Sequence, residues 1–298
     1  MKATRIPDLA WVEAPDPVPG PDDVLVRVHA AGVNRADLLQ ARGHYPAPPG
    51  ASEILGLEIA GVREDTGERV CALLPGGGYA ERAAVHRGVL MPMADGWSFA
   101  QGAAVPEVWL TAFVNLFLEG GLKRGETALI HAGASGVGLA AIQLARDAGA
   151  RVLVTVRSES KHEACRRLGA EVVAPNHQEP VDVIVDCVGG SYLADNIRTL
   201  SPFGRLVIIG VLGGSKAEID LAAVLRKRLK VVGSTLRSRP RNEHVEIVRA
   251  FRERFYGKVL DGTFEIPIDR TFPVTEAAAA HAFMGANQNT GKIILTIE

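Results

Sequence analysis

Residues 127–138 read TALIHAGASGVG, and this stretch decides the fold class. Its first residues have the apolar character of a buried strand, and a glycine-rich turn follows without a gap. Gly133, Gly136 and Gly138 form a variant of the GxGxxG fingerprint, with Ser135 at the middle glycine position. The first glycine permits a tight turn, and the exposed N-terminus of the following helix favours a pyrophosphate. The stretch predicts a dinucleotide-binding loop; the alternative is a glycine-rich turn that binds nothing.

The sequence around this loop alternates short apolar strands with helices. We expect strands at 127–131, 151–156, 171–174, 181–187, 205–210 and 230–234. Such βαβ alternation predicts an α/β fold with a doubly wound parallel sheet of the Rossmann type. A further amphipathic helix is expected at 242–256, and a closing strand at 292–297.

The N-terminal third of the chain is β-rich instead. Val24, Val26, Val28 and Ala30 occupy every second position, which is the period of a strand with one buried face. Proline and glycine interrupt the region, for example at 46–50, and predict turns or loops. The chain is therefore expected to combine a β-rich domain with the doubly wound one.

Composition and charge are those of an ordinary packed protein. Of the 298 residues, 47% are hydrophobic and 22% charged, and the formal net charge is −1. This balance argues against nucleic-acid or membrane-surface partners, which need clustered basic residues. No apolar run is long enough to span a membrane, and the first residues lack the apolar core of a signal peptide. The three scattered cysteines form no CxxC pair, so we expect a reducing, cytoplasmic location without disulfides or zinc knuckles.

The residues after the second strand of the doubly wound domain bear on which dinucleotide binds. NAD sites usually carry an acidic residue there, which bonds the ribose 2′-hydroxyl. This chain has Arg157 instead, followed by Ser158 and Lys161. Two cations and a hydroxyl suit a 2′-phosphate, so the sequence favours NADPH over NADH. Glu159 weakens this argument, and the alternative is a set of ordinary solvated charges at a helix start.

Two other strands of this domain end in glycine-rich exits. One exit reads DCVGG at 186–190, and the other reads IGVLGG at 209–214. Ligands of open α/β sheets bind at the carboxyl ends of the strands, so both exits are expected near the nicotinamide end of the cofactor. The alternative is a pair of tight turns.

Eight stretches together resemble one known family. They read AGVNRADLLQARGHYPAPPGAS (31–52), ILGLEIAG (54–61), ALLPGGGYAE (72–81), VPEVWLTAF (105–113), LIHAGASGVGLAAIQLA (129–145), DCVGGSY (186–192), TLRSR (235–239) and ANQNTGKIIL (286–295). On these stretches the chain resembles the zinc-independent quinone oxidoreductase branch of the medium-chain dehydrogenase/reductase superfamily, and especially its p53-inducible type. The resemblance implies a GroES-like catalytic domain at 1–110 and 265–298 and a Rossmann NADPH-binding domain at 111–264. It also implies a homodimer formed through the Rossmann domains.

The resemblance further implies a reaction without a catalytic metal. Zinc-using members carry a cysteine at the position of Asn34 and a GHE motif at residues 56–58, which read GLE here. A catalytic zinc site needs three nitrogen, sulfur or carboxylate ligands plus a water, and Leu57 cannot ligate. We therefore expect no metal, and acceptors that take a hydride readily without a Lewis acid.

By the same resemblance, Asn34 and Tyr45 are the candidate catalytic residues. Asn34 is expected to donate and accept hydrogen bonds near the nicotinamide and substrate, and Tyr45 to contact a quinone from a proline-rich loop. The alternatives are a turn-capping asparagine and a loop aromatic. His177 stands where the family often places a tyrosine beside the adenosine phosphate. The expected cofactor-binding residues are Thr111, Gly133, Ala134, Ser135, Gly136, Val137, Gly138, Arg157, Ser158, Lys161, His177, Val188, Gly189, Gly210, Val211, Leu212, Leu236 and Arg237.

These expectations define three hypotheses for function. The first is an NADPH:quinone oxidoreductase that passes a hydride from NADPH to quinones. The second is an NADPH-dependent reductase of α,β-unsaturated carbonyls or enoyl thioesters, which would need a proton donor for the developing enolate. The third is a dinucleotide-binding sensor or structural protein.

Overall fold

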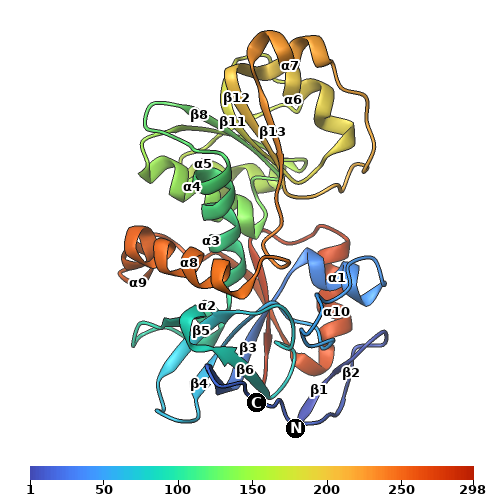
Figure 1. The fold of residues 1–298 in the computed structure, drawn as a ribbon, viewed down its shortest axis with the longest axis vertical. Helices are drawn as coiled ribbons and strands as arrows, with labels where there is room; N and C mark the ends of the chain where they lie inside the picture. Colours follow the sequence, from blue (N-terminus) through green and yellow to red (C-terminus); the bar gives the residue numbers. More distant parts are fainter. The chain divides into compact units, whose positions relative to one another are not determined.

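The computed structural model describes residues 1–298 and divides into two compact units. The first unit comprises residues 1–110 and 237–298, and the second comprises residues 111–236 (Figure 1). The sequence-based boundaries assign 237–264 to the Rossmann domain, whereas the structure assigns this segment to the first unit. The reason is packing, because the helix α8 (Arg241–Phe251) buries Phe251 against Trp109, with ring centroids 6.4 Å apart.

The second unit is built on a six-stranded parallel sheet with the order β10-β9-β8-β11-β12-β13. Helices α4 and α5 lie on one side of it, and α6 and α7 lie on the other (Figure 1). The predicted doubly wound parallel sheet is thereby confirmed. The elements are η2 (Val114–Glu119, a π-helix), β8 (Thr127–His131), α4 (Gly136–Asp147), β9 (Arg151–Thr155), η3 (Glu159–Lys161), α5 (His162–Arg167), β10 (Glu171–Val173), β11 (Val181–Asp186), η4 (Gly190–Tyr192), α6 (Leu193–Thr199), β12 (Leu200–Ile208), α7 (Leu221–Lys227) and β13 (Lys230–Gly233).

The strand order reverses beside β8. The chain runs outward from β8 to β10 and then returns to the opposite side of β8 to form β11. The connection from β10 to β11, residues 174–180, contains no helix. The reversal places the carboxyl ends of β8 and β11 next to each other, which is where open α/β sheets bind ligands.

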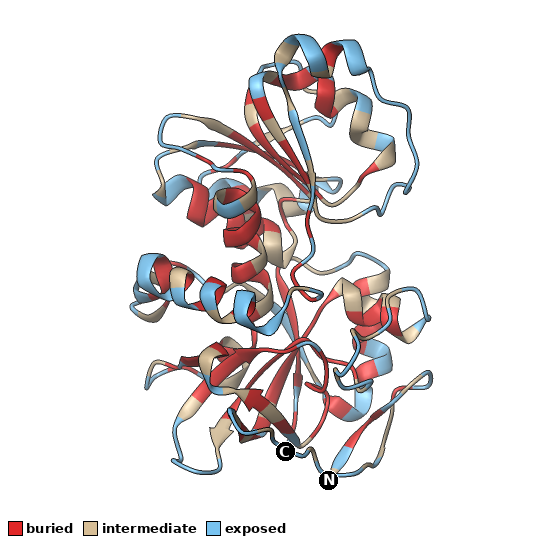
Figure 2. Cartoon of the chain, viewed as in Figure 1, coloured by how far each residue is buried: buried red, intermediate tan, exposed pale blue.

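Burial explains why these segments form a central sheet. Most residues of the strands β8, β9 and β11 are buried on both faces, as expected when helices cover both sides (Figure 2). Leu129, Leu153, Ile184 and Leu206 each expose 1% or less of their surface and belong to one apolar cluster. The rigid scaffold behind the glycine-rich loop is therefore a continuous apolar core.

The first unit contains a seven-stranded sheet with the order β14-β15-β3-β4-β5-β7, and β6 also pairs with β3. The expected alternation is confirmed, since Val24, Val26, Val28 and Ala30 of β3 are all buried. The C-terminal strand β15 pairs antiparallel with β3 and so lies inside the sheet. The remaining elements of this unit are β1 (Lys2–Arg5), β2 (Ala10–Glu13), β3 (Asp23–Val33), α1 (Arg35–Ala41), β4 (Glu58–Arg63), β5 (Arg69–Leu73), β6 (Arg82–His86), η1 (Arg87–Val89), β7 (Leu90–Pro92), α2 (Phe99–Ala103), η5 (Arg252–Tyr256, a π-helix), α9 (Gly257–Leu260), β14 (Ile268–Pro273), η6 (Val274–Glu276), α10 (Ala277–Gly285) and β15 (Lys292–Thr296), while α3 (Pro106–Phe113) begins in this unit and ends in the second.

The helices are short and mostly amphipathic or covered by the sheets. None of them combines the length and the apolar character that a membrane crossing requires.

Candidate active site

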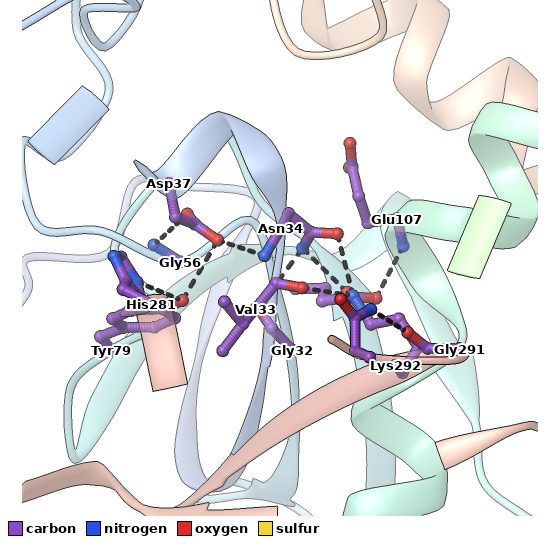
Figure 3. A network of polar contacts seen from close by, with 12 residues as sticks. Gly32, Val33, Asn34, Asp37, Gly56, Tyr79, Glu107, His281, Gly291 and Lys292 are labelled. Atoms are coloured by element: carbon purple, nitrogen blue, oxygen red, sulfur yellow. Dashed lines mark hydrogen bonds and ion pairs between the residues drawn. The ribbon is translucent and has the colours of Figure 1, made fainter. Parts of the chain in front are cut away.

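A buried polar network links residues of β3, β4 and β15 in the first unit (Figure 3). Lys292, the first residue of β15, donates from Nζ to the carbonyl oxygen of Val33 at 2.9 Å and to Oδ1 of Asn34 at 2.9 Å. The third N–H group of this ammonium donates to Oε1 of Glu58, the first residue of β4. All three protons of a buried ammonium group therefore have acceptors. The network ties the ends of three neighbouring strands together.

The carboxylate of Glu58 is fully buried and fully satisfied. Its Oε1 also accepts from Nδ2 of Asn34 at 2.9 Å, and its Oε2 accepts from the backbone N–H of Glu107 at 2.8 Å. Space for this carboxylate depends on Gly32, where an added Cβ would approach Glu58 Oε1 to 2.2 Å. Any larger residue at position 32 would displace the group that holds Lys292 in place.

The amide of Asn34 is held in one orientation by its neighbours. Its oxygen accepts from Lys292, and its nitrogen donates to Glu58 and, at 3.3 Å, to the carbonyl oxygen of Gly32. These bonds use both amide hydrogens. Asn34 also caps α1, because its backbone N–H donates to Asp37 at 2.7 Å. The side chain is thus a component of the network rather than a free donor.

A second buried group continues the network from α1. Asp37 accepts from the backbone N–H of Gly56 at 3.1 Å and from the hydroxyl of Tyr79 at 3.2 Å. That hydroxyl lies 3.3 Å from Nε2 of His281, so the ring nitrogen is the donor there. Burial raises the pKa of Asp37 to about 6, although these hydrogen bonds oppose the shift. Burial also lowers the pKa of His281 to about 4, so the imidazole is neutral at physiological pH.

Arg237 fixes the loop that carries Tyr45. Its buried guanidinium donates to the carbonyl oxygen of Pro75 at 2.7 Å, to that of Tyr45 at 3.3 Å and to the side chain of Gln40 at 2.7 Å. It also lies over the Tyr45 ring, 5.4 Å from the centroid. The backbone and the ring of Tyr45 are therefore held by one side chain.

Glu107 borders the same region from the first turn of α3. Its backbone N–H belongs to the network, but its side chain points away from it (Figure 3). The carboxyl group has no hydrogen bond or ion pair. Burial, and then the negative charge of Glu58, raise the pKa of Glu107 to about 8. The group is therefore mostly a neutral carboxylic acid at physiological pH.

In the second unit, the glycine-rich loop has the shape that the sequence predicts. A Cβ at Gly133 would approach Cβ of Val154 to 2.5 Å, and one at Gly138 would approach the carbonyl oxygen of Gly133 to 2.4 Å. Strand, loop and helix are therefore packed too closely for any side chain at these positions. Ser135 caps α4, since its Oγ accepts from the N–H of Gly138 at 3.0 Å. Its own hydroxyl proton remains available to a phosphate. Ala134 is buried, and Gly136 and Val137 are half-buried at the helix start.

A buried relay, which the sequence did not single out, links this loop to the DCVGG exit. His131 at the end of β8 contacts Thr155 Oγ1 at 2.9 Å through Nδ1 and Asn196 Oδ1 at 2.8 Å through Nε2. Asn196 in turn donates to Asp186 at 3.0 Å. The carboxylate of Asp186 accepts from the backbone N–H groups of Val188, at 2.6 Å, and Gly189, at 3.1 Å. The relay fixes the backbone at this exit.

The two glycine-rich exits are also bonded directly to each other. Leu212 and Gly213 donate backbone hydrogen bonds to the carbonyl oxygens of Cys187 and Val188, at 3.2 and 2.7 Å. Gly189 has a φ of 79°, which favours glycine. Gly210 is half-buried, whereas Val211 and Leu212 are exposed. The structure thus brings these predicted cofactor residues together at the carboxyl edge of the sheet.

The tip after β9 carries the predicted phosphate partners. Arg157 and Ser158 are exposed and Lys161 is half-buried, immediately beyond the carboxyl end of the strand. Ser158 Oγ lies 2.7 Å from Ser160 Oγ. The three residues are therefore on the same edge of the sheet as the glycine-rich loop.

His177 does not reach that edge, which corrects its assignment to the cofactor site. It lies 3.8 Å from Glu179, and its carbonyl oxygen accepts from Thr199 Oγ1 at 2.9 Å. Glu179 and Thr199 precede the starts of β11 and β12, so they mark the amino edge of the sheet. The short connection of residues 174–180 carries His177 to this opposite edge.

Two buried hydroxyl oxygens in the second unit have no hydrogen-bond partner, Thr111 Oγ1 and Ser234 Oγ. Thr111 is a predicted cofactor residue, and Ser234 directly follows β13 at the carboxyl edge of the sheet. Buried hydroxyl groups are normally hydrogen-bonded, so both oxygens suit contact with a polar ligand. Leu236 is buried two residues further on.

The chain matches two protein-family models. Residues 20–77 match the alcohol dehydrogenase GroES-like domain, and residues 136–253 match the zinc-binding dehydrogenase model. The quinone oxidoreductase of Mus musculus is 30% identical over 308 residues, which cover 94% of this chain and 91% of that protein. The chain belongs to the medium-chain dehydrogenase/reductase superfamily. It is therefore an oxidoreductase with the GroES-like and Rossmann-type domains of that superfamily.

Two solved structures match the chain along nearly its full length. The quinone oxidoreductase from Thermus thermophilus, described with its NADPH complex, is 32% identical with a TM-score of 0.87, and 100% of each chain is covered. The CurK enoyl reductase is 26% identical with a TM-score of 0.83, covering 99% of this chain and 97% of that one. A nicotinamide cofactor suits the glycine-rich loop, the Ser135 hydroxyl and the two unpartnered hydroxyl oxygens.

The residues present do not suit a catalytic zinc. No group of three His, Cys, Asp or Glu side chains is arranged to hold a metal ion. Zinc-using members have a cysteine at the position of Asn34. Here the side-chain oxygen of Asn34 accepts a hydrogen bond from the ammonium group of Lys292, and the same ammonium group also donates to Oε1 of Glu58. A divalent cation would be repelled by that ammonium, and Leu57 offers no ligand.

Proposed function

We propose that this chain is an NADPH:quinone oxidoreductase that works without a metal. The proposal depends on one observation: the ammonium group of Lys292 bonds Asn34 and Glu58 in the buried network, at the place where a zinc-using member would hold its metal ion. The 30 to 32% identical quinone oxidoreductases support the same reaction class. When bound, the reduced nicotinamide supplies a hydride, and quinones accept it without a Lewis acid.

Residues of the second unit would hold the cofactor. The N–H groups at the start of α4 and the Ser135 hydroxyl suit the pyrophosphate. Arg157, Ser158 and Lys161 suit a 2′-phosphate, because two cations and a hydroxyl follow β9 at the place where NAD sites usually carry an acidic residue. These groups are the reason for proposing NADPH rather than NADH.

Residues of the first unit would act on the substrate. We assign Tyr45 the substrate contact, since Arg237 holds its ring in one place. Asn34 is a positioning residue, because both of its amide hydrogens are used within the network. Arg237 acts on this loop rather than on the cofactor.

The experiment is an acceptor panel run with NADPH and NADH side by side on the purified protein. We expect NADPH oxidation with an ortho-quinone such as 9,10-phenanthrenequinone, and a Gly136→Asp variant that no longer binds the cofactor because its carboxylate faces the pyrophosphate site. Equal use of NADH would refute the assignment of Arg157 and Lys161. Retained cofactor binding by the variant would refute the loop assignment.

Reduction of α,β-unsaturated carbonyls or enoyl thioesters is the second candidate. The 26% identical enoyl reductase, which has the same fold, favours it. A Tyr45→Phe variant separates the two reactions. Near-complete loss of activity on every acceptor would favour enone chemistry, in which the tyrosine hydroxyl donates a proton. Tight NADPH binding with no turnover on any acceptor would instead indicate a dinucleotide-binding sensor.

We also propose that the protein is a homodimer through its Rossmann domain and works in the cytoplasm. Edge strand β13 leaves one side of its backbone unpaired and exposes 41% of Val231, and the preceding helix α7 exposes 69% of Leu221 and 78% of Leu225. Exposed edges and clustered apolar side chains favour pairing with a second copy.

A further inference from the structure

The buried relay of the second unit crosses the carboxyl edge of its sheet. The ends of β9, β8 and β11 each contribute one polar side chain, and α6 contributes a fourth. None of the four exposes more than 4% of its surface, and they are Thr155, His131, Asp186 and Asn196. His131 pairs with Thr155 in the register of β8 and β9, and β11 pairs with β8 on its other side. The relay therefore lies along the edge at which open α/β sheets bind ligands.

The direction of each hydrogen bond in the relay follows from the group at its end. The carboxylate of Asp186 only accepts, so Nδ2 of Asn196 faces it at 3.0 Å. The amide oxygen of Asn196 then faces Nε2 of His131 at 2.8 Å, and Nε2 carries the proton. Burial lowers the pKa of His131, although the hydrogen bond to Asn196 and the charge of Asp186 oppose the shift, so the ring is neutral. Its Nδ1 accepts from the hydroxyl of Thr155 at 2.9 Å.

The relay connects the glycine-rich loop with the DCVGG exit. At one end, the backbone carbonyl oxygen of Thr155 accepts from the N–H of Gly133, the first glycine of the loop, at 3.0 Å. At the other end, Asp186 accepts from the backbone N–H groups of Val188, at 2.6 Å, and Gly189, at 3.1 Å. Both N–H groups are used within the protein, so the exit offers a bound ligand a defined shape.

Two other features of the same edge suit a ring that carries an amide. Ser234 is buried and its hydroxyl oxygen has no hydrogen-bond partner, while its backbone N–H donates to Ile208 at the end of β12, at 2.9 Å. In the IGVLGG exit, Val211 and Leu212 expose 52% and 57% of their surface. A polar atom without a partner and an apolar surface together fit the carboxamide and the ring of nicotinamide.

We propose that His131 is a positioning residue for the nicotinamide coenzyme. It fixes the orientation of the Asn196 amide, which keeps Asp186 on the N–H groups of Val188 and Gly189 and holds the DCVGG exit in the shape that receives the nicotinamide end. Without the N–H of His131, the buried amide oxygen of Asn196 loses its donor and the amide is free to turn. The inference rests on the proposed function, because it requires the coenzyme to bind along this edge.

The test compares His131→Phe with the conservative variant His131→Gln. Phenylalanine keeps a planar ring for the edge contact with Tyr192, whose ring centroid lies 4.8 Å from that of His131, but it has no donor and no acceptor. Glutamine supplies an amide N–H that donates to Asn196 in place of Nε2. The first variant breaks the relay, and the second keeps its direction.

The Kd of each protein is measured by isothermal titration calorimetry for NADPH and for adenosine 2′,5′-bisphosphate, a fragment without the nicotinamide half. We expect His131→Phe to raise the Kd of NADPH at least about tenfold and that of the fragment less than about twofold, because the relay ends at the DCVGG exit. We expect His131→Gln to keep the Kd of NADPH within about threefold of the wild type. Equal weakening of both ligands, an unchanged Kd of NADPH, or no rescue by glutamine would overturn the proposal.

A second measurement uses the wild type alone and does not depend on the folding of a variant. Long-range ¹H–¹⁵N NMR of protein labelled at histidine distinguishes the two tautomers of a neutral ring from the imidazolium. We expect His131 of the cofactor-free protein to be neutral and protonated at Nε2 at neutral pH. A proton on Nδ1 would overturn the direction of the relay and with it the role of His131.

Both measurements separate this inference from the proposed function, because neither needs an electron acceptor. A wild type that binds NADPH and reduces no quinone refutes the proposed function. The role of His131 is decided by the two Kd values and the tautomer, whatever the acceptor panel gives.

Discussion

Replacing Lys292 by methionine tests the energetic role of the buried network. The side chains of Lys292 and Glu58 expose only 4% and 0% of their surface. Methionine keeps the length and apolar stem of lysine, so the change removes the charge and three donors without a large cavity. The carbonyl oxygen of Val33 and the amide oxygen of Asn34 lose their donor, and Glu58 loses its countercharge.

The expected cost follows from these losses. Two orphaned acceptors cost about 1–3 kcal/mol each when no water replaces the donor. Breaking a buried ion pair by removing one partner typically costs about 3–5 kcal/mol in total, and the two figures overlap. We therefore expect Lys292→Met to lower the free energy of unfolding of the first unit by about 3–5 kcal/mol.

Tryptophan fluorescence in urea measures this change selectively. The chain has three tryptophans, Trp11, Trp97 and Trp109, and all lie in the first unit. The fluorescence transition therefore reports the unfolding of that unit, while far-UV circular dichroism reports both. A surface control, Lys2→Met, should shift the free energy by less than about 0.5 kcal/mol.

A double-mutant cycle with Glu58→Gln isolates the ion pair. We expect a coupling energy of more than about 1 kcal/mol between positions 58 and 292, because the two side chains share one hydrogen-bond network. The reasoning would be refuted if Lys292→Met cost less than about 1 kcal/mol, or if its cost were the same with glutamine at position 58.

Three other outcomes follow from the structure. Arg157→Ala should raise the KM for NADPH at least about tenfold and leave the KM for NADH unchanged, because only NADPH carries the 2′-phosphate that Arg157 would bind; an equal change for both in steady-state kinetics would contradict this. Leu225→Glu should convert the proposed dimer to a monomer in light scattering coupled to size exclusion, since a charge on α7 would be buried in the interface; an unaltered mass would exclude this surface. Arg237→Met should free the Tyr45 loop, which limited proteolysis would detect as faster cleavage between residues 43 and 53; cleavage at the wild-type rate would show that the three hydrogen bonds do not restrain the loop.

Local patterns predicted most of the fold. The strand expected at 127–131 is β8 (Thr127–His131), and the closing strand expected at 292–297 is β15 (Lys292–Thr296). Both follow from apolar runs, whose signal depends only on adjacent residues. The domain boundary after β13 could not be predicted in the same way. It depends on the packing of Phe251 against Trp109, and the residues next to Phe251 in the sequence do not indicate that contact.

The site was predicted only in part, for a related reason. Asn34 was singled out by its motif, but Lys292 lies 258 residues away along the chain, and spacing says nothing about such a pair. Tyr45 was predicted without the residue that restrains it, since Arg237 was assigned to the cofactor. His177 lies at the opposite edge of the sheet from its expected place beside the cofactor, because the connection that carries it is short and has no helix. Pro175 and Pro180 are the sign of this short connection in the sequence.

The central position of β15 has a consequence for how the protein is made. This strand is translated after the entire second unit, yet it sits between β14 and β3 and carries the ammonium that neutralises Glu58. The nascent Rossmann unit is contiguous and can mature as soon as residue 236 clears the ribosome tunnel. The GroES-like unit must meanwhile wait, with an unneutralised carboxylate and an open sheet, until its last strand arrives.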